Sequence, residues 1–316
     1  MIPAANNGIY AFPMPAATVT SRPEETGLDY LIRPSRSRRL LRFPSTAFFI
    51  AIAFLISTGC AARTAALLNK TGLEQFRHER YDQAYESFSE AIALSPESAE
   101  LYYNRAGSAE KLARFRDAQA DLTKAIELEP AYLDAYIRRA GLSFDRSRFE
   151  SARADWSSVL ALSPDNADAY LGRGRALERL ERTDEAHADF DRAVILSPGD
   201  AVPLISRGRF SFGIGNFEQA LDDLTSAASL SPKSPEPYLY RGVVYEYGLL
   251  RPDEALADYT RAVEISPKDP YVRNYRASLL RKLGRTKEAL ADFSAICRMG
   301  YPFGCWQHDW LIDEKR

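Results

Sequence analysis

Histidine and cysteine, the side chains best suited to nucleophilic or metal chemistry, are few in this sequence. The three histidines, His78, His187 and His308, lie far apart in a chain of 316 residues. A catalytic triad needs its members within hydrogen-bond reach, and a metal site needs several converging ligands. Neither spacing is present, and no glycine-rich phosphate loop is found either. We therefore expect no enzymatic activity, no metal and no cofactor.

Charged residues show a regular spacing instead. One set of arginines and one set of aspartates recur every 34 or 35 residues, and both are missing from the first interval, which has Thr71 and Ser87. The arginines could form a row that binds acidic ligands, or the two sets could pair between packed helices. Because they occur and disappear together, we expect structural ion pairs. The two sets are Arg105, Arg139, Arg173, Arg207, Arg241 and Arg276, and Asp121, Asp155, Asp189, Asp223, Asp258 and Asp292.

The segments that must position these charges recur at the same interval of 34 or 35 residues. An alanine recurs at intervals of 34, 34, 34, 34, 35 and 34 residues, and a proline keeps the same register through six units. Within a unit, Tyr170, Gly174 and Leu177 show helical spacing, and Ala186, Phe190 and Ala193 repeat it. Each unit is therefore expected to form two amphipathic helices, with a turn between them and proline after the second. The alanines are Ala84, Ala118, Ala152, Ala186, Ala220, Ala255 and Ala289.

A helical hairpin of 34 residues with this pattern resembles the tetratricopeptide repeat. The small residue of the first helix is glycine or alanine in all seven units, and a large residue stands opposite it in the second. The resemblance implies an all-α, right-handed superhelical solenoid, since no hairpin buries its apolar face alone. The sixth unit has one extra residue, which we place near 249–252. The expected repeats are 65–98, 99–132, 133–166, 167–200, 201–234, 235–269 and 270–302, followed by a capping helix and tail at 303–316.

The resemblance also implies a binding surface, because the groove of such arrays is lined by certain first-helix positions. One matching position is apolar in most repeats, and another carries aromatic residues in several. A stripe of this kind suits a peptide segment or helix of a protein partner, although a tight superhelix could partly cover it. The expected groove residues are Tyr103, Ile137, Phe144, Leu171, Ile205, Phe212, Leu239 and Tyr247.

The amino-terminal segment resembles an export signal. Residues 1–42 include a proline-rich stretch without apolar periodicity, from which we expect disorder, and they end in an arginine cluster. The apolar segment 43–59 follows, and the small residues before Cys60 resemble the lipobox of bacterial lipoproteins, although Ser57 replaces the preferred aliphatic residue. We predict lipidation of Cys60, with residues 60–64 as anchor and short linker. An uncleaved signal anchor and an ordinary cleaved signal peptide are the alternatives.

The remaining two cysteines, Cys297 and Cys305, are separated by seven residues. Their spacing resembles the cysteine pair that links helical hairpins in Sel1-like repeat proteins, and an exported compartment is oxidising. The resemblance implies a disulfide between the last full helix and the capping helix. Two buried thiols are the alternative, and a zinc site with His308 would lack a fourth ligand.

Composition and charge limit the possible functions further. The chain has 46% hydrophobic residues and a net charge of −2, which excludes collagen-like, wholly disordered and polytopic membrane proteins. Residues 60–316 carry a net charge of −5, so we expect no nucleic-acid partner. The sequence predicts a membrane-anchored scaffold for proteins in the bacterial envelope, at the periplasmic face of the outer membrane or anchored in the inner membrane. The alternatives are a signal-anchored scaffold facing the cytoplasm and a protein that binds cell-wall carbohydrate.

Overall fold

The computed structural model describes the backbone of residues 45–313 and the side chains of residues 60–313. The described backbone is helical throughout, apart from turns, and confirms the all-α prediction. Its helices are α1 (Ser45–Arg77), α2 (Tyr81–Leu94), α3 (Ala99–Lys111), α4 (Phe115–Leu128), α5 (Leu133–Asp145), α6 (Phe149–Leu162), α7 (Ala167–Arg179), α8 (Thr183–Leu196), α9 (Ala201–Gly213), α10 (Phe217–Leu230), α11 (Glu236–Val243), the π-helical turn η1 (Val244–Gly248), α12 (Pro252–Ile265), α13 (Pro270–Lys282), α14 (Thr286–Arg298) and α15 (Pro302–Asp313).

Helices from α1 to α14 pair into hairpins because a small residue in each first helix meets a large one in the second. A Cβ added at Gly174 would lie 3.1 Å from the ring of Phe190, and one added at Gly242 only 2.6 Å from the ring of Tyr259. Both large residues are almost completely buried. The absence of a side chain at these glycines therefore permits the close approach of the paired helices.

The turn between the two helices of a hairpin has the same backbone conformation in every repeat. One residue there adopts a positive φ, as Ala113 does at 57° and Gly215 at 81°. This left-handed conformation ends the first helix and reverses the chain. Two of the seven turns use glycine, whereas the others place Glu79, Ala113, Ser147, Glu181 and Leu250 at the strained position.

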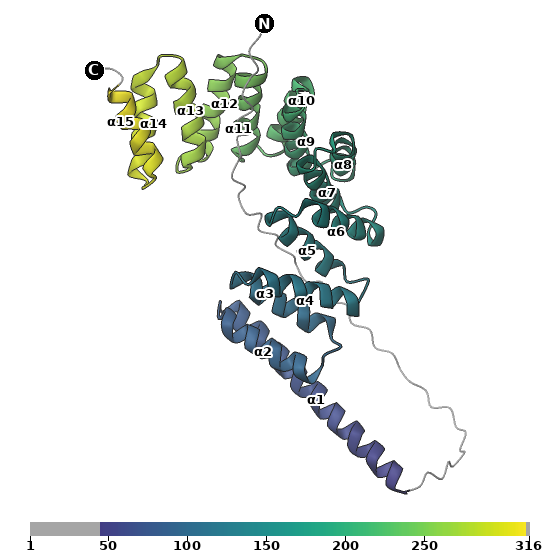
Figure 1. Cartoon of the computed structure of the whole chain (residues 1–316). Coiled ribbons are helices and arrows are strands. Elements are labelled where there is room, and N and C mark those ends of the chain that lie inside the picture. The colour runs from purple at the N-terminus through teal and green to yellow at the C-terminus, as the bar shows by residue number, and fades with distance from the viewer. Residues whose placement is uncertain (1–44, 314–316) are drawn as a thin grey trace. The chain divides into compact units, whose positions relative to one another are not determined.

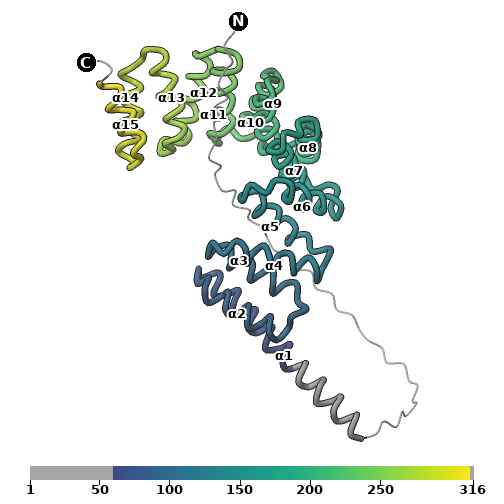
Figure 2. The backbone as a smooth tube through the Cα atoms, in the orientation of Figure 1, coloured from purple at the N-terminus to yellow at the C-terminus, as the bar shows by residue number. Residues whose placement is uncertain are grey.

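Hairpins stack because each second helix also packs against the first helix of the next repeat. Contacts of this kind join α2 to α3, α4 to α5, and so on to α12 and α13. Figure 1 shows the helices following one another in chain order, and the tube in Figure 2 shows the chain reversing between the helices of each pair. The buried residues accordingly form a series of small apolar clusters, each shared between neighbouring helices. This arrangement is a superhelical repeat stack.

The sixth repeat accommodates its extra residue inside the first helix. The sequence pattern placed this residue near 249–252, but the structure shows a π-helical turn earlier, at Val244–Gly248. The wider turn keeps the backbone hydrogen-bonded, as in the bond from Leu249 N–H to the Val244 carbonyl at 3.0 Å. The insertion therefore changes the side chains that this helix presents and leaves the following helix α12 in register.

The first repeat begins without a break in the backbone. Helix α1 runs through residues 60–64, the predicted anchor and short linker. The predicted extension 1–42 lies outside the described residues, and so do the side chains of the predicted signal segment 43–59. Among the side chains that are described, no helix has a stretch long and apolar enough to cross a bilayer.

The last helix, α15, covers the end of the stack as a capping helix. Leu311 is buried with Phe293 and Ile296 of α14, and Gly304 permits close approach, since an added Cβ would lie 2.5 Å from the Ile296 side chain. A disulfide joins Cys297 to Cys305 with a Cα–Cα distance of 4.6 Å, which confirms the predicted pairing. The final hairpin and its cap are thus linked both covalently and by apolar packing.

Candidate functional site: the exposed face of the first helices

The recurring arginines and aspartates form ion pairs within the six hairpins from α3–α4 to α13–α14. In every pair, Nε and Nη2 of the arginine donate to the two carboxylate oxygens at 2.6 to 2.9 Å. The hydrogen bond to Asp189 raises the pKa of Arg173. The pairs are Arg105–Asp121, Arg139–Asp155, Arg173–Asp189, Arg207–Asp223, Arg241–Asp258 and Arg276–Asp292.

These arginines also reach the preceding repeat. In the five pairs from Arg105 to Arg241, the remaining nitrogen, Nη1, donates to a side chain on the previous second helix, as from Arg139 to Thr123 at 3.0 Å and from Arg207 to Asp191 at 2.8 Å. Tyrosine rings lie beside several of the guanidinium groups, as Tyr136 does beside Arg139 at 5.8 Å. Because their guanidinium groups donate to side chains on two other helices, these arginines hold adjacent repeats together and have few donors left for a ligand.

The predicted apolar stripe is interrupted in the middle of the array. Leu171 and Ile205 are only 5% and 7% exposed, because each packs into the core of its hairpin against the next repeat. Ile137 and Leu239 are half-buried against the same kind of cluster. The prediction that these residues form an open apolar groove is therefore wrong for Leu171 and Ile205, since close packing of neighbouring first helices covers them.

The predicted aromatic positions also have intramolecular partners. Phe144 packs edge-on against Phe149 at 5.3 Å, and Phe212 lies 5.8 Å from Phe217. In both cases the partner begins the second helix, so the ring pair closes the hairpin turn. Tyr247 is 45% exposed, and the ammonium of Lys282 lies 4.5 Å from its ring. Of these three residues, Tyr247 is the one most accessible to a partner.

Polar residues that the sequence did not point to lie beside the predicted groove residue Tyr103. At the amino-terminal side, Nε of Arg138 lies 3.0 Å from Glu110, and its guanidinium covers the ring of Tyr103 at 4.9 Å. Gly107 provides the space, because a Cβ there would lie 2.9 Å from Nη2 of Arg138. Burial raises the pKa of Glu110 despite the opposing charge of Arg138. Tyr103 also packs against Tyr132 at 5.2 Å.

A second cluster extends over four successive first helices, α7, α9, α11 and α13. Nη2 of Arg175 donates to Oγ of Ser206 at 3.1 Å, and the guanidinium of Arg209 lies 4.9 Å from the ring of Tyr240. Burial lowers the pKa of Arg175, and the nearby charge of Arg209 lowers it further. Burial raises the pKa of Tyr275, and the nearby charges of Tyr240 and Arg209 act on the same hydroxyl group. We call Arg175, Ser206, Arg209, Tyr240 and Tyr275 the arginine–tyrosine patch.

A sequence signal for this patch was present. Arg173-Gly174-Arg175 is repeated as Arg207-Gly208-Arg209 in the next unit, with the same spacing of 34 residues. In each of these Arg-Gly-Arg segments the first arginine pairs with an aspartate of the same hairpin. The second arginine contacts the first helix of the next repeat, as Arg175 contacts Ser206. The Arg-Gly-Arg sequence alone does not show which arginine has which partner, because the partner depends on which helix face meets the following repeat.

The π-helical turn places a buried carboxylate beside the patch. Glu246 accepts hydrogen bonds from Oη of Tyr259 at 2.9 Å and from Nζ of Lys282 at 2.6 Å. Tyr259 stands at the large-residue position of the second helix, where other repeats have phenylalanine, leucine or tryptophan. Its hydroxyl is therefore satisfied inside the hairpin by the inserted turn. The cluster connects repeats six and seven with polar contacts.

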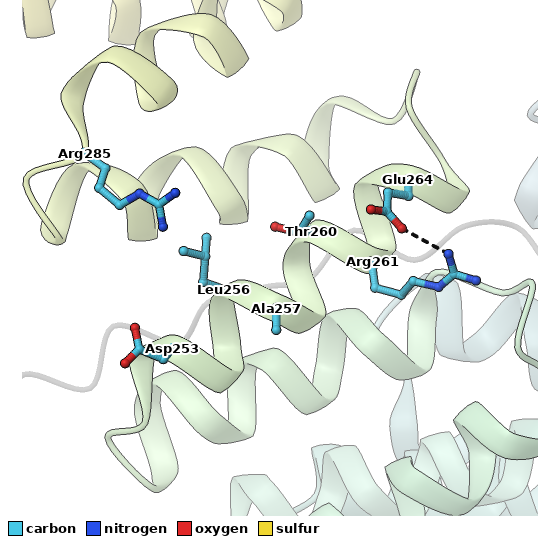
Figure 3. Close-up of a pocket in the computed structure, with 7 residues that line it drawn as sticks. All are labelled: Asp253, Leu256, Ala257, Thr260, Arg261, Glu264 and Arg285. Atoms are coloured by element: carbon cyan, nitrogen blue, oxygen red, sulfur yellow. Dashed lines mark hydrogen bonds and ion pairs between the residues drawn. The ribbon is translucent and has the colours of Figure 1, made fainter.

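An open hollow along α12 contains Arg261 paired with Glu264 at 3.0 Å, and Arg285 from the next hairpin points towards it (Figure 3). Within the described side chains, no group of three histidine, cysteine, aspartate or glutamate residues is placed to hold a metal ion. The hollow is lined by Asp253, Leu256, Ala257, Thr260, Arg261, Glu264 and Arg285.

Comparison with known proteins identifies the repeat. Two models described as tetratricopeptide repeat match residues 69–114, 138–201, 212–270 and 245–301, and residues 99–132. No curated protein sequence matches the chain. Similar solved structures include a tetratricopeptide repeat protein from Parabacteroides merdae, with 18% identity and a TM-score of 0.66 over 79% of this chain and 99% of that one.

Two further structures share the fold. Yeast Tom70 has 17% identity and a TM-score of 0.58 over 82% of this chain and 56% of that one. Pseudomonas aeruginosa pilF has 13% identity and a TM-score of 0.55 over 69% of this chain and 99% of that one. At these identities the likeness concerns the arrangement of the helices.

Proposed function

The chain belongs to the tetratricopeptide repeat family, and from this membership we propose that it is a non-enzymatic adaptor that holds other proteins on the face of its first helices. The observation that carries the proposal is the arginine–tyrosine patch, which extends over four successive repeats. Arginine and tyrosine are enriched where protein interfaces derive most of their binding energy. The array presents this surface and catalyses no reaction.

We further propose that the adaptor is anchored to a bacterial membrane through Cys60. This cysteine is a free, exposed thiol on helix α1. Lipidation would add acyl chains that each contribute about 0.8 kcal/mol per buried methylene, and more than one chain gives stable anchoring. Ala61 after the cysteine resembles the sorting signal for the outer membrane, which favours the periplasmic face of that membrane over the inner membrane.

The disulfide between Cys297 and Cys305 supports this location. Disulfides persist in oxidising compartments such as the periplasm and are rare in the cytosol. A scaffold facing the cytoplasm would keep both thiols reduced. Trapping free thiols with a maleimide in intact cells separates the two locations, since an exported array leaves both cysteines unlabelled until a reductant is added.

The anchor is tested by intact mass of the membrane-extracted protein and of its Cys60→Ala variant. A chain that begins at residue 60 and carries acyl mass, which the variant lacks, supports the lipoprotein. An unprocessed chain without acyl mass contradicts it and leaves the signal-anchored scaffold. A chain cleaved but not acylated indicates an ordinary signal peptide and a protein released from the membrane.

A further inference from the structure

The capping helix α15 buries one side against the repeat stack and exposes aromatic residues on the other. Gly304 and Leu311 are buried, whereas Trp306 is 65% exposed and Trp310 40% exposed. The two tryptophans are four residues apart and so share one side of the helix. Terminal units of repeat arrays need a polar outer side to stay soluble, and α15, the last helix in Figure 1, presents tryptophan there instead. An aromatic outer side of this kind indicates a further contact.

The exposed aromatic surface continues onto the neighbouring first helix, α13. Phe303, near the start of α15, stacks on Tyr271 of α13 with 6.3 Å between ring centroids, and Tyr271 is itself exposed. Towards the other end of α15, the guanidinium of Arg281 on α13 lies 4.9 Å from the ring of Trp310. An aromatic ring therefore marks one end of this surface and a cation the other, and the two attract each other. We call Tyr271, Phe303, Trp306 and Trp310 the cap aromatic surface.

The charges of α15 are unfavourable for a helix that stands alone. Asp309, whose side chain is 75% exposed, and Asp313 both lie towards the carboxyl-terminal end, and the first turn contains no acidic residue. The helix dipole favours the reverse, with anions near the amino terminus and cations near the carboxyl terminus. A second α15 packed antiparallel would bring each carboxyl-terminal end beside the amino-terminal end of the other helix. The exposed side of α15 thus complements a copy of itself in charge.

The same charges disfavour a lipid surface as the occupant, because helices that lie in a membrane interface carry lysine and arginine on their polar side. The size of the surface suits a reversible contact between proteins. A helix of 12 residues is about 18 Å long, so the contact falls at the small end of specific interfaces, which bury about 800 Å² per partner at standard size. The disulfide from Cys305 to Cys297 holds α15 in place, which lowers the cost of ordering it on association.

We propose that two copies of this chain associate through the cap aromatic surface, with their α15 helices antiparallel about a two-fold axis. Trp306 lies near the axis, and Asp313 of each copy lies beside the amino-terminal end of α15 in the other. A two-fold contact of this type is closed, so it joins two arrays and does not extend further. The dimer goes beyond the adaptor function, because it doubles the number of binding surfaces without changing any of them.

The first test is sedimentation equilibrium of the full-length chain in detergent whose density the buffer matches, from about 1 to about 100 μM, the range expected for a small interface. We expect a reversible monomer–dimer equilibrium. Trp306→Ser with Trp310→Ser should weaken dimerisation about a hundredfold or more, because large aromatic residues supply most of the binding energy of such contacts. Leu162→Ser with Ile195→Ser is the matched control, since these second-helix residues are 44% and 65% exposed.

Two charge variants test the antiparallel arrangement. Asp313→Arg and Pro302→Asp each agree with the dipole of their own helix, so neither should unfold α15, as circular dichroism can check. Alone, each should dimerise about tenfold more weakly, because like charges then meet twice across the two-fold axis. An equimolar mixture should dimerise more strongly than either variant alone, since the introduced arginine of one copy then faces the introduced aspartate of the other.

The outcomes decide the proposal. A wild-type chain that stays monomeric over the whole concentration range overturns it, and would assign the cap aromatic surface to a different protein. A dimer that persists in the tryptophan variant places the contact elsewhere and also overturns it. A mixture of the charge variants that dimerises no better than each alone contradicts the antiparallel two-fold contact. None of these results affects the adaptor function, which depends on the arginine–tyrosine patch.

Discussion

Arginine has two roles in this protein, and its position on the first helix decides between them. At the position of Arg173 the side chain enters the hairpin and pairs with a buried aspartate, whereas at the position of Arg175 it meets the next first helix. Removal of a structural arginine strands a carboxylate, and the cost of that exceeds the net stabilisation by the pair. Substitutions at the two positions should therefore differ in kind, with loss of stability at one and loss of binding at the other.

Arg173→Met should lower the free energy of unfolding by about 2–4 kcal/mol, because Asp189, whose side chain is 7% exposed, keeps its charge without its partner. Asp189→Leu should cost a similar amount. The double variant should cost clearly less than the sum of the two, as measured by urea denaturation. Additive losses would mean that the two residues contribute independently.

Tyr259→Phe tests the hydrogen bond that the inserted π turn provides. Phenylalanine already occupies this position in repeats one, four and seven, so the packing should be retained. The variant removes the donor to Glu246, and we expect a loss of about 1–3 kcal/mol in the free energy of unfolding. Phe190→Leu, a change of packing without a hydrogen bond, provides the comparison. A neutral result for Tyr259→Phe would show that Lys282 alone satisfies the carboxylate.

Alkaline pH should destabilise the fold through its partly buried tyrosines. Burial raises the pKa of Tyr132 to about 12, and it also raises the pKa of Tyr240. Between pH 10 and pH 12 the unfolded chain releases these protons while the folded chain retains them, so stability falls as pH rises. Phenolate absorbance and circular dichroism, followed together, should show a group of tyrosines that ionises only on unfolding. Ionisation of all tyrosines near pH 10 in folded protein would contradict this.

At the scale of the elements, the repeat interval predicted the hairpins, their order and the capping helix. The interval fixes where helices begin and end because proline and turn residues recur with it. It did not locate the extra residue of repeat six, since a π turn leaves the apolar pattern on both sides intact and moves only the residues between. It also did not show that Leu171 and Ile205 are covered, because burial there depends on how closely adjacent repeats approach.

The turns provide a test of strain within an element. Ala113 has a φ of 57°, a conformation that costs residues with a side chain about 1 kcal/mol and glycine much less. Ala113→Gly should therefore raise the free energy of unfolding by about 0.5–1 kcal/mol. Gly284→Ala, at the equivalent turn with a φ of 73°, should have the opposite effect. Thermal denaturation of both variants checks the prediction, and the same sign for both would refute it.

At the scale of the whole molecule, each repeat is expected to be stabilised mainly by its immediate neighbours, because it contacts the repeats adjacent to it. The two ends then matter most, since each has a neighbour on one side only. At the carboxyl-terminal end, α15 and the disulfide take the place of the missing repeat. Such an arrangement predicts that the cap stabilises the last repeats against local opening and has little influence on the first repeats.

Cys297→Ser with Cys305→Ser should remove about 2–3 kcal/mol of constraint, according to the loop-closure model for a closed loop this short. Because Leu311 and Gly304 still pack on α14, we expect α15 to open more often without global unfolding. Hydrogen exchange should accelerate most in α15, less in α14 and α13, and hardly at all in α3 and α4. The same rate change in every helix would mean that the stack unfolds as one unit, and neighbouring repeats would then be coupled far more strongly than contacts between adjacent hairpins imply.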